Sequence, residues 1–313
     1  MTTGLVSTRT ALEHDTGSGH AERPARLVAV LERLEACGLM QETVALDAPL
    51  ASIEPVQAAH DASYLETVRR ACEAGGAQLD PDTPCSSGSW EATLRTTGGL
   101  LAACDRVHEG EWSNAFVASR PPGHHAEHDR AMGFCLVNHV VVAARHLQRT
   151  HGYERVAILD WDVHHGNGSQ HMTESDPTLF YGSLHQHPLY PGTGAADERG
   201  RGDGEGTVVN LPLPAGTGDN AFLTTFEERL LPAVEAFAPD FLLLSAGFDA
   251  HVADPLAQLE LTADVYRRLT ERLTAFAAER CGGRLVSLLE GGYNLNALAD
   301  CVEAHVGELT RGE

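Results

Sequence analysis

Three side chains with metal-binding chemistry lie just after two apolar runs of the sequence. Asp162 and His164 follow the run 156–159, and Asp249 follows the run 241–244. Because residues two apart in an extended chain point to the same side, Asp162 and His164 can bind one ion together. Two carboxylates and one imidazole leave a coordination position open for water, which is typical of a catalytic rather than a structural metal site. We therefore predict a catalytic metal centre, with zinc as the first choice and ferrous iron as the second.

The residues around these ligands favour a single metal ion. A two-metal hydrolase places its ions a few ångströms apart and needs further carboxylates beside the first set. In this sequence H-G-N follows His164, and A-H follows Asp249. We therefore expect one catalytic ion.

Adjacent histidines, His124 and His125, follow a turn at 120–123 that contains two prolines and a glycine. Such a turn fixes the loop, so the imidazoles are held in place. Histidine suits both general-base and general-acid roles because its ordinary pKa lies near neutrality. A hydrogen-bonded partner holds the useful tautomer, and Asp160 and Asn167 are the expected partners.

Tyr293 follows two glycines that allow the backbone to approach a site closely. Its phenol can donate a hydrogen bond to the oxyanion that develops on a carbonyl during hydrolysis. The sequence has no G-x-S-x-G elbow, and its cysteines have no accompanying base, so we do not expect a serine or thiol nucleophile. Together these residues predict hydrolysis by metal-activated water.

Helix-like stretches alternate with short apolar runs along the chain. The expected helices span 24–37, 55–74, 89–109, 138–150, 220–237 and 262–280, and the expected strands span 115–118, 156–159, 178–184, 207–211, 241–244 and 285–289. Continuous apolar runs are typical of strands that are covered on both faces, as in a parallel sheet between helical layers. Polar residues follow four of the runs, and in such a sheet all the carboxyl ends of the strands share one edge, where ligands bind. We predict a single α/β domain over 1–313 in which four distant segments meet at one site.

Composition narrows the range of partners. A formal charge of -22 disfavours nucleic acids and anionic membranes and favours cationic substrates. No stretch approaches the roughly 18 apolar residues of a membrane-spanning helix. The N-terminal segment lacks the basic start, apolar run and cleavage site of a secretory signal, so we expect a cytoplasmic protein.

Over almost its whole length, the sequence resembles the superfamily of histone deacetylases and acetylpolyamine amidohydrolases. The matching segments are H-A-E-R-P-A-R, R-P-P-G-H-H-A, G-F-C-L-V-N, D-W-D-V-H-H-G-N-G, S-L-H, Y-P-G-T-G, S-A-G-F-D-A, D-P-L and L-E-G-G-Y-N. In this superfamily the second histidine of the pair is backed by aspartate in class I and by asparagine in class II. With Asn167 at that position, the sequence is similar to class II members and to bacterial histone deacetylase-like amidohydrolases.

The resemblance implies the three-layer arginase/deacetylase fold, with zinc bound by the three predicted ligands. It implies that His124 pairs with Asp160, that His125 is the main general base and acid, and that Tyr293 stabilises the oxyanion. It also implies a structural potassium ion behind the zinc, at positions Asp160, Asp162, His164, Ser183 and Leu184.

The resemblance further implies a substrate tunnel walled by Phe134 and Tyr190, with Gly133, Leu256 and Gly292 also contributing to substrate binding. Two ring faces can hold an aliphatic stem without burying a charge. The expected substrate is an acetylated lysine of a peptide or protein. Polyamine-selective relatives carry a glutamate where this chain has Leu256, which weakens the reading that the substrate is an acetylpolyamine.

The sequence leaves two other functions open. A small acetylated amine, such as an acetylpolyamine or a secondary metabolite, is the second substrate class, and a tight homo-oligomer with occluded tunnels would favour it. The third alternative is a catalytically silent, metal-bound binding module.

Overall fold

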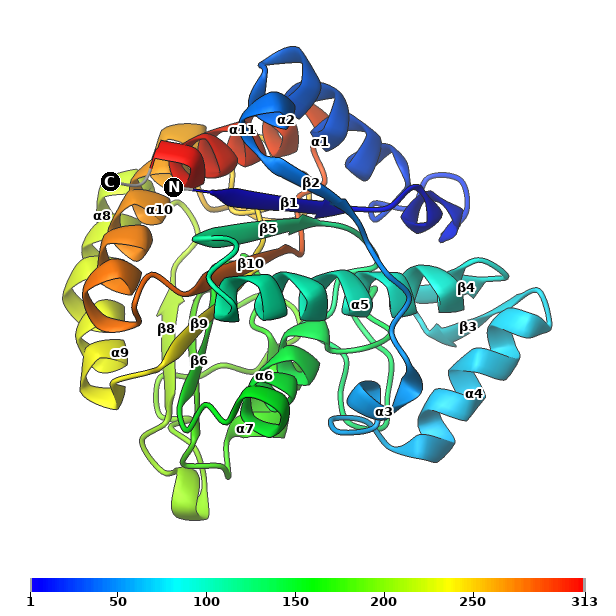
Figure 1. The fold of residues 1–313 in the computed structure, drawn as a ribbon, viewed down its shortest axis with the longest axis horizontal. Coiled ribbons are helices and arrows are strands. Elements are labelled where there is room, and N and C mark those ends of the chain that lie inside the picture. The colour runs from blue at the N-terminus through cyan, green and yellow to red at the C-terminus, as the bar shows by residue number, and fades with distance from the viewer. Residues whose placement is uncertain (1, 312–313) are drawn as a thin grey trace.

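The computed structural model describes residues 2–311 and is built around an eight-stranded sheet (Figure 1). The strands lie in the order β2-β1-β5-β10-β9-β6-β7-β8, and every neighbouring pair is parallel. Their bounds are β1 Thr3–Ser7, β2 Val44–Asp47, β5 Asn114–Ala118, β6 Val156–Asp160, β7 Leu179–Gln186, β8 Val208–Leu213, β9 Phe241–Ala246 and β10 Leu285–Leu289. A separate antiparallel pair consists of β3 Gly76–Asp80 and β4 Thr83–Ser86.

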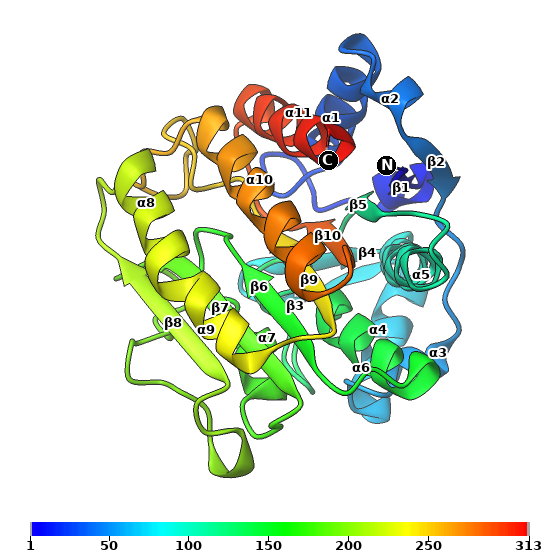
Figure 2. The same cartoon turned by 60° about the vertical axis from the view of Figure 1, so that its left-hand side comes forward.

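Helices cover both faces of the sheet, as the two views show (Figures 1 and 2). One layer contains α1 Ala25–Ala36, α2 Leu39–Glu42, α8 Asp219–Thr225, α9 Leu231–Phe237, α10 Ala263–Arg280 and α11 Leu295–Arg311. The other contains α3 Ile53–Val56, α4 Ala62–Glu73, α5 Ser89–His108 and α6 His139–His151, and α7 Asn167–Thr173 packs beside α6. Among residues 2–311, none of the helices has both the length and the apolar character that a membrane span requires.

Alternate side chains of each central strand enter two different hydrophobic cores. In β9, Leu242 and Leu244 pack in the core under α10 and α11, whereas Phe241 and Leu243 pack in the core under α5 and α6. All four are essentially inaccessible to solvent, and each such side chain contributes about 1.5–3 kcal/mol through burial. This double burial explains the continuous apolar runs and confirms the predicted parallel sheet between helical layers.

The prediction of one continuous helix over 55–74 is wrong, because the structure divides this stretch into α3 and α4. The side chain of Asp61 accepts hydrogen bonds from the backbone N–H groups of Ser63 and Tyr64, which caps the start of α4. An aspartate in this role satisfies N–H groups that have no partner inside the helix, so it favours a new helix start. The expected helix over 220–237 is continuous, but its middle, Phe226–Leu230, is a π-helical turn.

Several elements were not predicted. The largest is α11, which packs against α1 and α10. β1 lies between β2 and β5 and carries only a short apolar run. These two elements bring both ends of the described chain together, since the hydroxyl of Thr3 donates to the carbonyl of Leu309 over 2.9 Å.

Candidate active site

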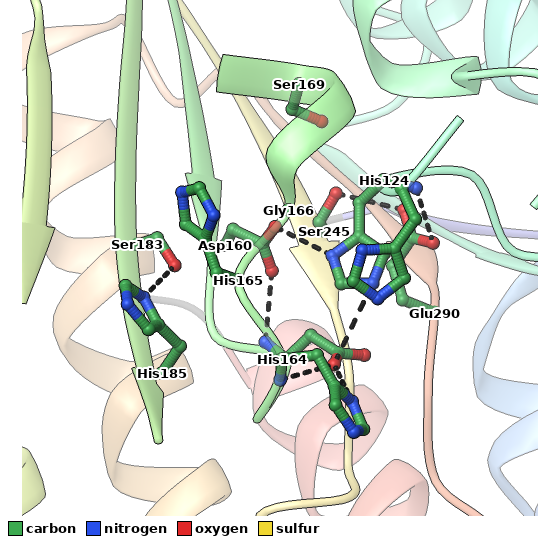
Figure 3. A network of polar contacts seen from close by, with 12 residues as sticks. His124, Asp160, His164, His165, Gly166, Ser169, Ser183, His185, Ser245 and Glu290 are labelled. Carbon is green, nitrogen blue, oxygen red and sulfur yellow. Dashed lines mark hydrogen bonds and ion pairs between the residues drawn. The ribbon is translucent and has the colours of Figure 1, made fainter. Parts of the chain in front are cut away.

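Four neighbouring strands carry the polar segments that the sequence predicted to converge. β5, β10, β9 and β6 are consecutive in the sheet and parallel, so their carboxyl ends lie side by side at one edge. The segment after β5 supplies His124 and His125, and the segment after β10 supplies Tyr293. The segments after β6 and β9 supply the predicted metal ligands. Figure 3 shows part of this edge from close by.

Asp162, His164 and Asp249 come together as a buried group with the donor atoms that a metal ion requires. The Nδ1 atom of His164 lies 3.1 Å from Oδ1 of Asp162 and 3.2 Å from Oδ2 of Asp249. Two glycines leave space for these carboxylates. A Cβ atom at Gly247 would lie 2.2 Å from Oδ2 of Asp162, and one at Gly291 would lie 2.0 Å from Oδ2 of Asp249.

The electrostatics of the triad favour a cation at its centre. Burial alone would lower the pKa of His164, but hydrogen bonds and charges from Asp162 and Asp249 raise it to about 10. Burial and the charge of Asp162 raise the pKa of Asp249 to about 7. Without an ion, the two buried carboxylates thus favour protons on His164 and Asp249. Their oxygens, together with one imidazole, suit a divalent ion with open positions in place of these protons.

His124 is held through both its ring and its backbone. Its Nδ1 atom lies 3.0 Å from Oδ2 of Asp160, which also accepts a 3.0 Å hydrogen bond from the hydroxyl of Tyr181. The backbone N–H groups of Gly123 and His124 donate to Oε2 of Glu290, over 2.6 and 3.2 Å. The sequence identified Asp160 as a partner but not Tyr181 or Glu290. The only signal for Glu290 was its place directly after β10.

His125 begins a hydrogen-bonded chain that reaches a partly exposed histidine. Its Nδ1 atom lies 2.8 Å from Oδ1 of Asn167, and Nδ2 of Asn167 donates to Oε1 of Glu127 over 2.5 Å. Glu127 also pairs with Nδ1 of His171, at 2.8 and 2.9 Å. A carboxylate can only accept, so Glu127 turns the amide nitrogen of Asn167 toward itself and the amide oxygen toward His125. The proton of neutral His125 therefore sits on Nδ1, and Nε2 keeps a lone pair.

The two adjacent histidines have different protonation preferences because their neighbours differ. Burial and the charges of His124 and His164 lower the pKa of His125 well below its usual value. Burial would also lower the pKa of His124, but the charges of Asp162 and Asp160 raise it to about 10. With ring centroids 4.0 Å apart, the pair combines a neutral imidazole with a protonated one. Environments that separate two pKa values in this way are typical of acid–base sites.

A cavity of about 250 Å³ leads to this group of residues. Its lining consists of Asp82, His125, Gly133, Phe134, His164, Leu189, Tyr190, Leu256 and Tyr293. His125, His164 and Tyr293 form a polar floor. The walls are mainly apolar, and the ring of Tyr190, which is 38% exposed, stands 5.1 Å from that of His125, edge to face.

The lining agrees with most of the predicted substrate positions and differs at three. Gly292 was expected to contribute but does not line the cavity; it turns the chain at φ 122°. Leu189 and Asp82 line it without having been predicted. Leu189 immediately precedes the recognised Y-P-G-T-G segment, whereas Asp82 stands in a D-P-D-T stretch with no distinguishing pattern.

Two of the residues expected around a potassium ion, Asp162 and His164, belong to the triad itself, and the other three lie at the end of β6 and in β7. Asp160 and Ser183 face each other in the register of β6 and β7, and Leu184 follows Ser183. The Asp162 backbone N–H donates to Oδ1 of Asp160 over 3.1 Å. The hydroxyl of Ser183 lies 2.9 Å from Nδ1 of His185 (Figure 3).

A buried ionic network connects the loops that carry His124 and Tyr293. Glu22 binds Arg120 through two hydrogen bonds of 2.7 and 2.6 Å and Arg26 through one of 3.1 Å. Arg26 also donates to the carbonyl oxygens of Gly292 and Glu290, at 2.6 and 2.5 Å. All three charged side chains are 0% exposed. The H-A-E-R-P-A-R segment thus connects the loop before His124 with the loop before Tyr293.

A model of the histone deacetylase domain matches residues 20–309. The chain belongs to the histone deacetylase family. Three similar proteins agree with this assignment. A probable deacetylase of Archaeoglobus fulgidus is 40% identical over 297 residues, covering 94% of this chain and 82% of that protein. A histone deacetylase-like amidohydrolase of Pseudomonas aeruginosa is 40% identical over 294 residues, covering 94% and 77%. Histone deacetylase 14, chloroplastic, of Arabidopsis thaliana is 40% identical over 325 residues, covering 97% and 77%.

Solved structures of the histone deacetylase family agree with the fold. The crystal structure of the HDA15 HD domain superposes with a TM-score of 0.95 at 35% identity, covering 99% of this chain and 88% of that one. This chain is accordingly an amide hydrolase of the histone deacetylase family, and the buried triad is its candidate metal centre.

Proposed function

We propose that the chain is a zinc-dependent deacetylase that hydrolyses the acetyl amide of acetyl-lysine side chains to free amine and acetate. One observation carries the proposal. His164 of the candidate metal triad, the neutral His125 and Tyr293 line one cavity whose walls are mainly apolar. These are the parts that attack on one carbonyl carbon requires.

Asp162, His164 and Asp249 would hold the ion, with zinc as the first choice and ferrous iron as the second. When bound, such an ion supplies Lewis-acid polarisation of the acyl carbonyl and lowers the pKa of water. Carbonyl and hydroxyl oxygens near Asp160 and Ser183 would hold a structural potassium ion behind it, because hard oxygen ligands suit alkali cations.

His125 is suited to accept the proton of the attacking water. Its lowered pKa keeps the ring neutral, and the contact with Asn167 leaves the Nε2 lone pair free. As the carbon–nitrogen bond breaks, a protonated histidine gives its proton to the leaving amine. His124, whose pKa is raised to about 10, keeps positive charge beside the reaction.

Tyr293 is suited to stabilise the oxyanion. Burial and the nearby charges of Asp249 and Asp162 raise the pKa of its phenol well above the usual value, so the hydroxyl stays a hydrogen-bond donor. Its ring stands edge to face with Phe134, 5.8 Å between centroids, and the Arg26 guanidinium lies 5.0 Å from its ring centroid. A held donor of this kind lowers the barrier by several kcal/mol in comparable sites, about 3 kcal/mol for one donor.

The cavity favours a long aliphatic stem. Phe134, Leu189 and Leu256 contribute apolar surface, and none of them offers a charge to a second amine. A lysine side chain carries four methylene groups before its amide and needs only such walls. Each buried methylene contributes about 0.8 kcal/mol.

One observation favours a second candidate, the hydrolysis of a small acetylated amine such as an acetylpolyamine. Asp82 lines the same cavity and is partly exposed, so its carboxylate could pair with a distant ammonium group. An exposed pair of this kind contributes about 1 kcal/mol or less.

The test is a panel of acyl-lysine peptides and acetylpolyamines assayed with the zinc-loaded enzyme, alongside metal-stripped protein. We expect acetyl-lysine peptides to be hydrolysed with the higher kcat/KM. An Asp82→Asn variant separates the two substrate classes, because it should raise KM selectively for a polyamine. Turnover of polyamines alone would replace the lysine proposal, and full zinc occupancy with no turnover of any acylated amine would refute both.

A further inference from the structure

A second group of metal-binding side chains lies at the opposite edge of the sheet. Asp105 is in the last turns of α5, and His146 and His151 are in the last turns of α6, which packs against α5. Each helix leads into the amino end of the next strand, β5 or β6, so both helices end far from the edge that carries the candidate active site (Figure 1). The group is therefore separate from the catalytic residues.

The donor atoms of this group converge on one point. The Nε2 atoms of His146 and His151 each lie 2.7 Å from the same oxygen, Oδ1 of Asp105. The two rings are perpendicular, with centroids 5.4 Å apart. In a tetrahedral zinc site, ligand atoms stand roughly 3.3 Å apart, so each of the two contacts with Asp105 needs to lengthen by only about 0.6 Å. Asp105, whose side chain is 39% exposed, has the freedom to make that movement.

Contacts behind the histidines orient them as metal ligands. The Nδ1 atom of His146 lies 3.2 Å from the hydroxyl of Thr150, which can accept its proton and leave the Nε2 lone pair facing Asp105. Without an ion, each Nε2–H can instead donate to Asp105, so a metal ion would replace these protons at the same atoms. The ring of His151 stacks on that of His108, 4.0 Å between centroids, and His108 is in turn 3.0 Å from the hydroxyl of Tyr153. The contact of His146 with Thr150 is of the kind that orients metal-binding histidines, and the stacking on His108 limits the movement of the His151 ring.

The exposure of the group suits a site that exchanges its ion with solvent. The side chains of His146 and His151 are 14% and 13% exposed, so an ion can enter past Asp105 while water completes its coordination. The net charge of -22 raises the local concentration of cations around the molecule.

We propose that Asp105, His146 and His151 bind a second divalent transition-metal ion, independent of the catalytic centre. Imidazole and carboxylate ligands suit zinc, and they also suit copper and nickel, so zinc is the first probe. The ion would join the last turns of α5 and α6 at the amino edge of the sheet.

The experiment measures zinc per chain by elemental analysis after equilibrium dialysis against buffered free zinc. It compares the unaltered protein with Asp105→Asn, with the double variant Asp105→Asn/His151→Gln, and with Asp162→Asn at the catalytic triad. We expect the double variant to lose one equivalent of zinc while its deacetylase activity is unchanged. Asp105→Asn alone should weaken binding of the second ion, because it removes the carboxylate from the three ligands.

Circular dichroism checks that each variant is folded. If the double variant does not fold, the comparison is made with Asp105→Asn alone. Equal zinc uptake by the unaltered protein, Asp105→Asn and the double variant would overturn the proposal. The three side chains would then form only a hydrogen-bonded cluster. Loss of zinc by Asp162→Asn reports on the catalytic centre separately. A protein that binds zinc only through Asp105, His146 and His151 would contradict the proposed catalytic metal while supporting this one. Crystals soaked in zinc should show an anomalous peak between the three side chains.

Discussion

At the scale of single residues, the site depends on hydrogen bonds that choose between otherwise equivalent atoms. His124 and His125 are adjacent and chemically identical, but one faces Asp160 and the other faces Asn167. An aspartate partner adds a negative charge, whereas an asparagine partner adds only a dipole. Together with the charge of Asp162, which also raises the pKa of His124, and with burial, which lowers that of His125, this difference favours a charged His124 beside a neutral His125.

Replacing His125 with alanine should remove the base without removing the binding of the substrate. We expect kcat to fall by roughly 100-fold to 10,000-fold, which is the usual contribution of a positioned general base, while KM changes little. Steady-state kinetics on an acetyl-lysine peptide measures both constants. Full retention of kcat would show that another group accepts the proton.

The pairing of Asn167 with Glu127 can be tested by changing both residues. Asn167→Asp places two carboxylates in contact, so we expect kcat to fall on the order of tenfold or more. Glu127→Gln alone should have a small effect, because its amide oxygen can still accept from Asn167. The double variant restores a donor beside the new aspartate and should recover kcat relative to Asn167→Asp. Additive losses in the two single variants and the double variant would mean that Glu127 does not position Asn167.

Sequence reasoning identified the partners of both histidines but not Glu127 or Glu290. Asp160 and Asn167 belong to the same motif as the metal ligands, so spacing alone pointed to them. Glu127 contacts Asn167 because α7 packs against the loop after β5, where the backbone N–H of Ser169 donates to the carbonyl of His124 over 3.1 Å. Glu290 reaches His124 because β10 lies beside β5. Such contacts depend on the order of strands, which a pattern of apolar runs does not encode.

At the scale of elements, the buried Glu22 connects the N-terminal segment to two loops of the site. It lies before α1, and its partners lie after β5 and in the first turn of α1. Two arginines without Glu22 would be buried charges without compensation. The position of His124 and Tyr293 therefore depends on a segment about a hundred residues or more away in sequence.

Replacing Glu22 with glutamine should lower the free energy of unfolding by about 3–5 kcal/mol, the usual cost of breaking a buried ion pair. Urea denaturation measures the change. Glu66→Gln is the matched control, because Glu66 pairs with Arg69 and Arg70 on the surface of α4 and should matter little. Equal effects of the two variants would show that the buried network does not stabilise the fold.

The central elements were predictable from sequence because their burial leaves a clear pattern. The strands around β6 and β9 are continuous apolar runs, and α5 and α10 have long periodic patterns. The N-cap at Asp61 and the short strand β1 were missed, since one hydrogen-bonding side chain and a few apolar residues give weak signals. α11 begins two residues after Tyr293, and no proline separates it from the G-G-Y loop in the sequence.

At the scale of the whole molecule, several histidines are locked in the interior as neutral rings. Burial lowers the pKa of His60 to about 4 and that of His305 to about 3, and burial together with the charge of His60 lowers that of His139 to about 3. The backbone N–H of Asn138 donates to Nε2 of His60 over 2.9 Å, so that ring accepts and is neutral. These three rings therefore bind fewer protons in the folded state than in the unfolded state below neutral pH.

Stability should fall as the pH drops from about 6.5 toward 4. In this window the histidines become protonated in the unfolded state but stay neutral in the folded state. The free energy of unfolding therefore falls by up to about 3 kcal/mol for each ring at pH 4. Urea midpoints at constant ionic strength measure the slope. His305→Gln removes one titrating ring, so its slope should be shallower whatever its absolute stability; an unchanged slope would contradict the assignment.

Further acidification should lower the free energy of unfolding a second time, as Glu22 becomes protonated. Burial alone would raise the pKa of Glu22, but the charge of Arg120 and hydrogen bonds from His14 and Arg120 hold it well below 4.5. Its folded pKa is thus depressed, so its contribution is complete above the unfolded value and disappears as the pH falls through the folded one. Glu22→Gln should not show this part of the acid transition.

The floor and the walls of the cavity differ in how much change they can tolerate. The imidazoles of His125 and His164 are hydrogen-bonded to partners, whereas the side chains of Leu189 and Leu256 contribute only shape and apolar surface from separate loops. Mutation can therefore remodel the slot without touching the reaction. Selection for a new acyl group would act on a few side chains of the wall. The same catalytic residues could therefore serve many acylated amines in the course of evolution.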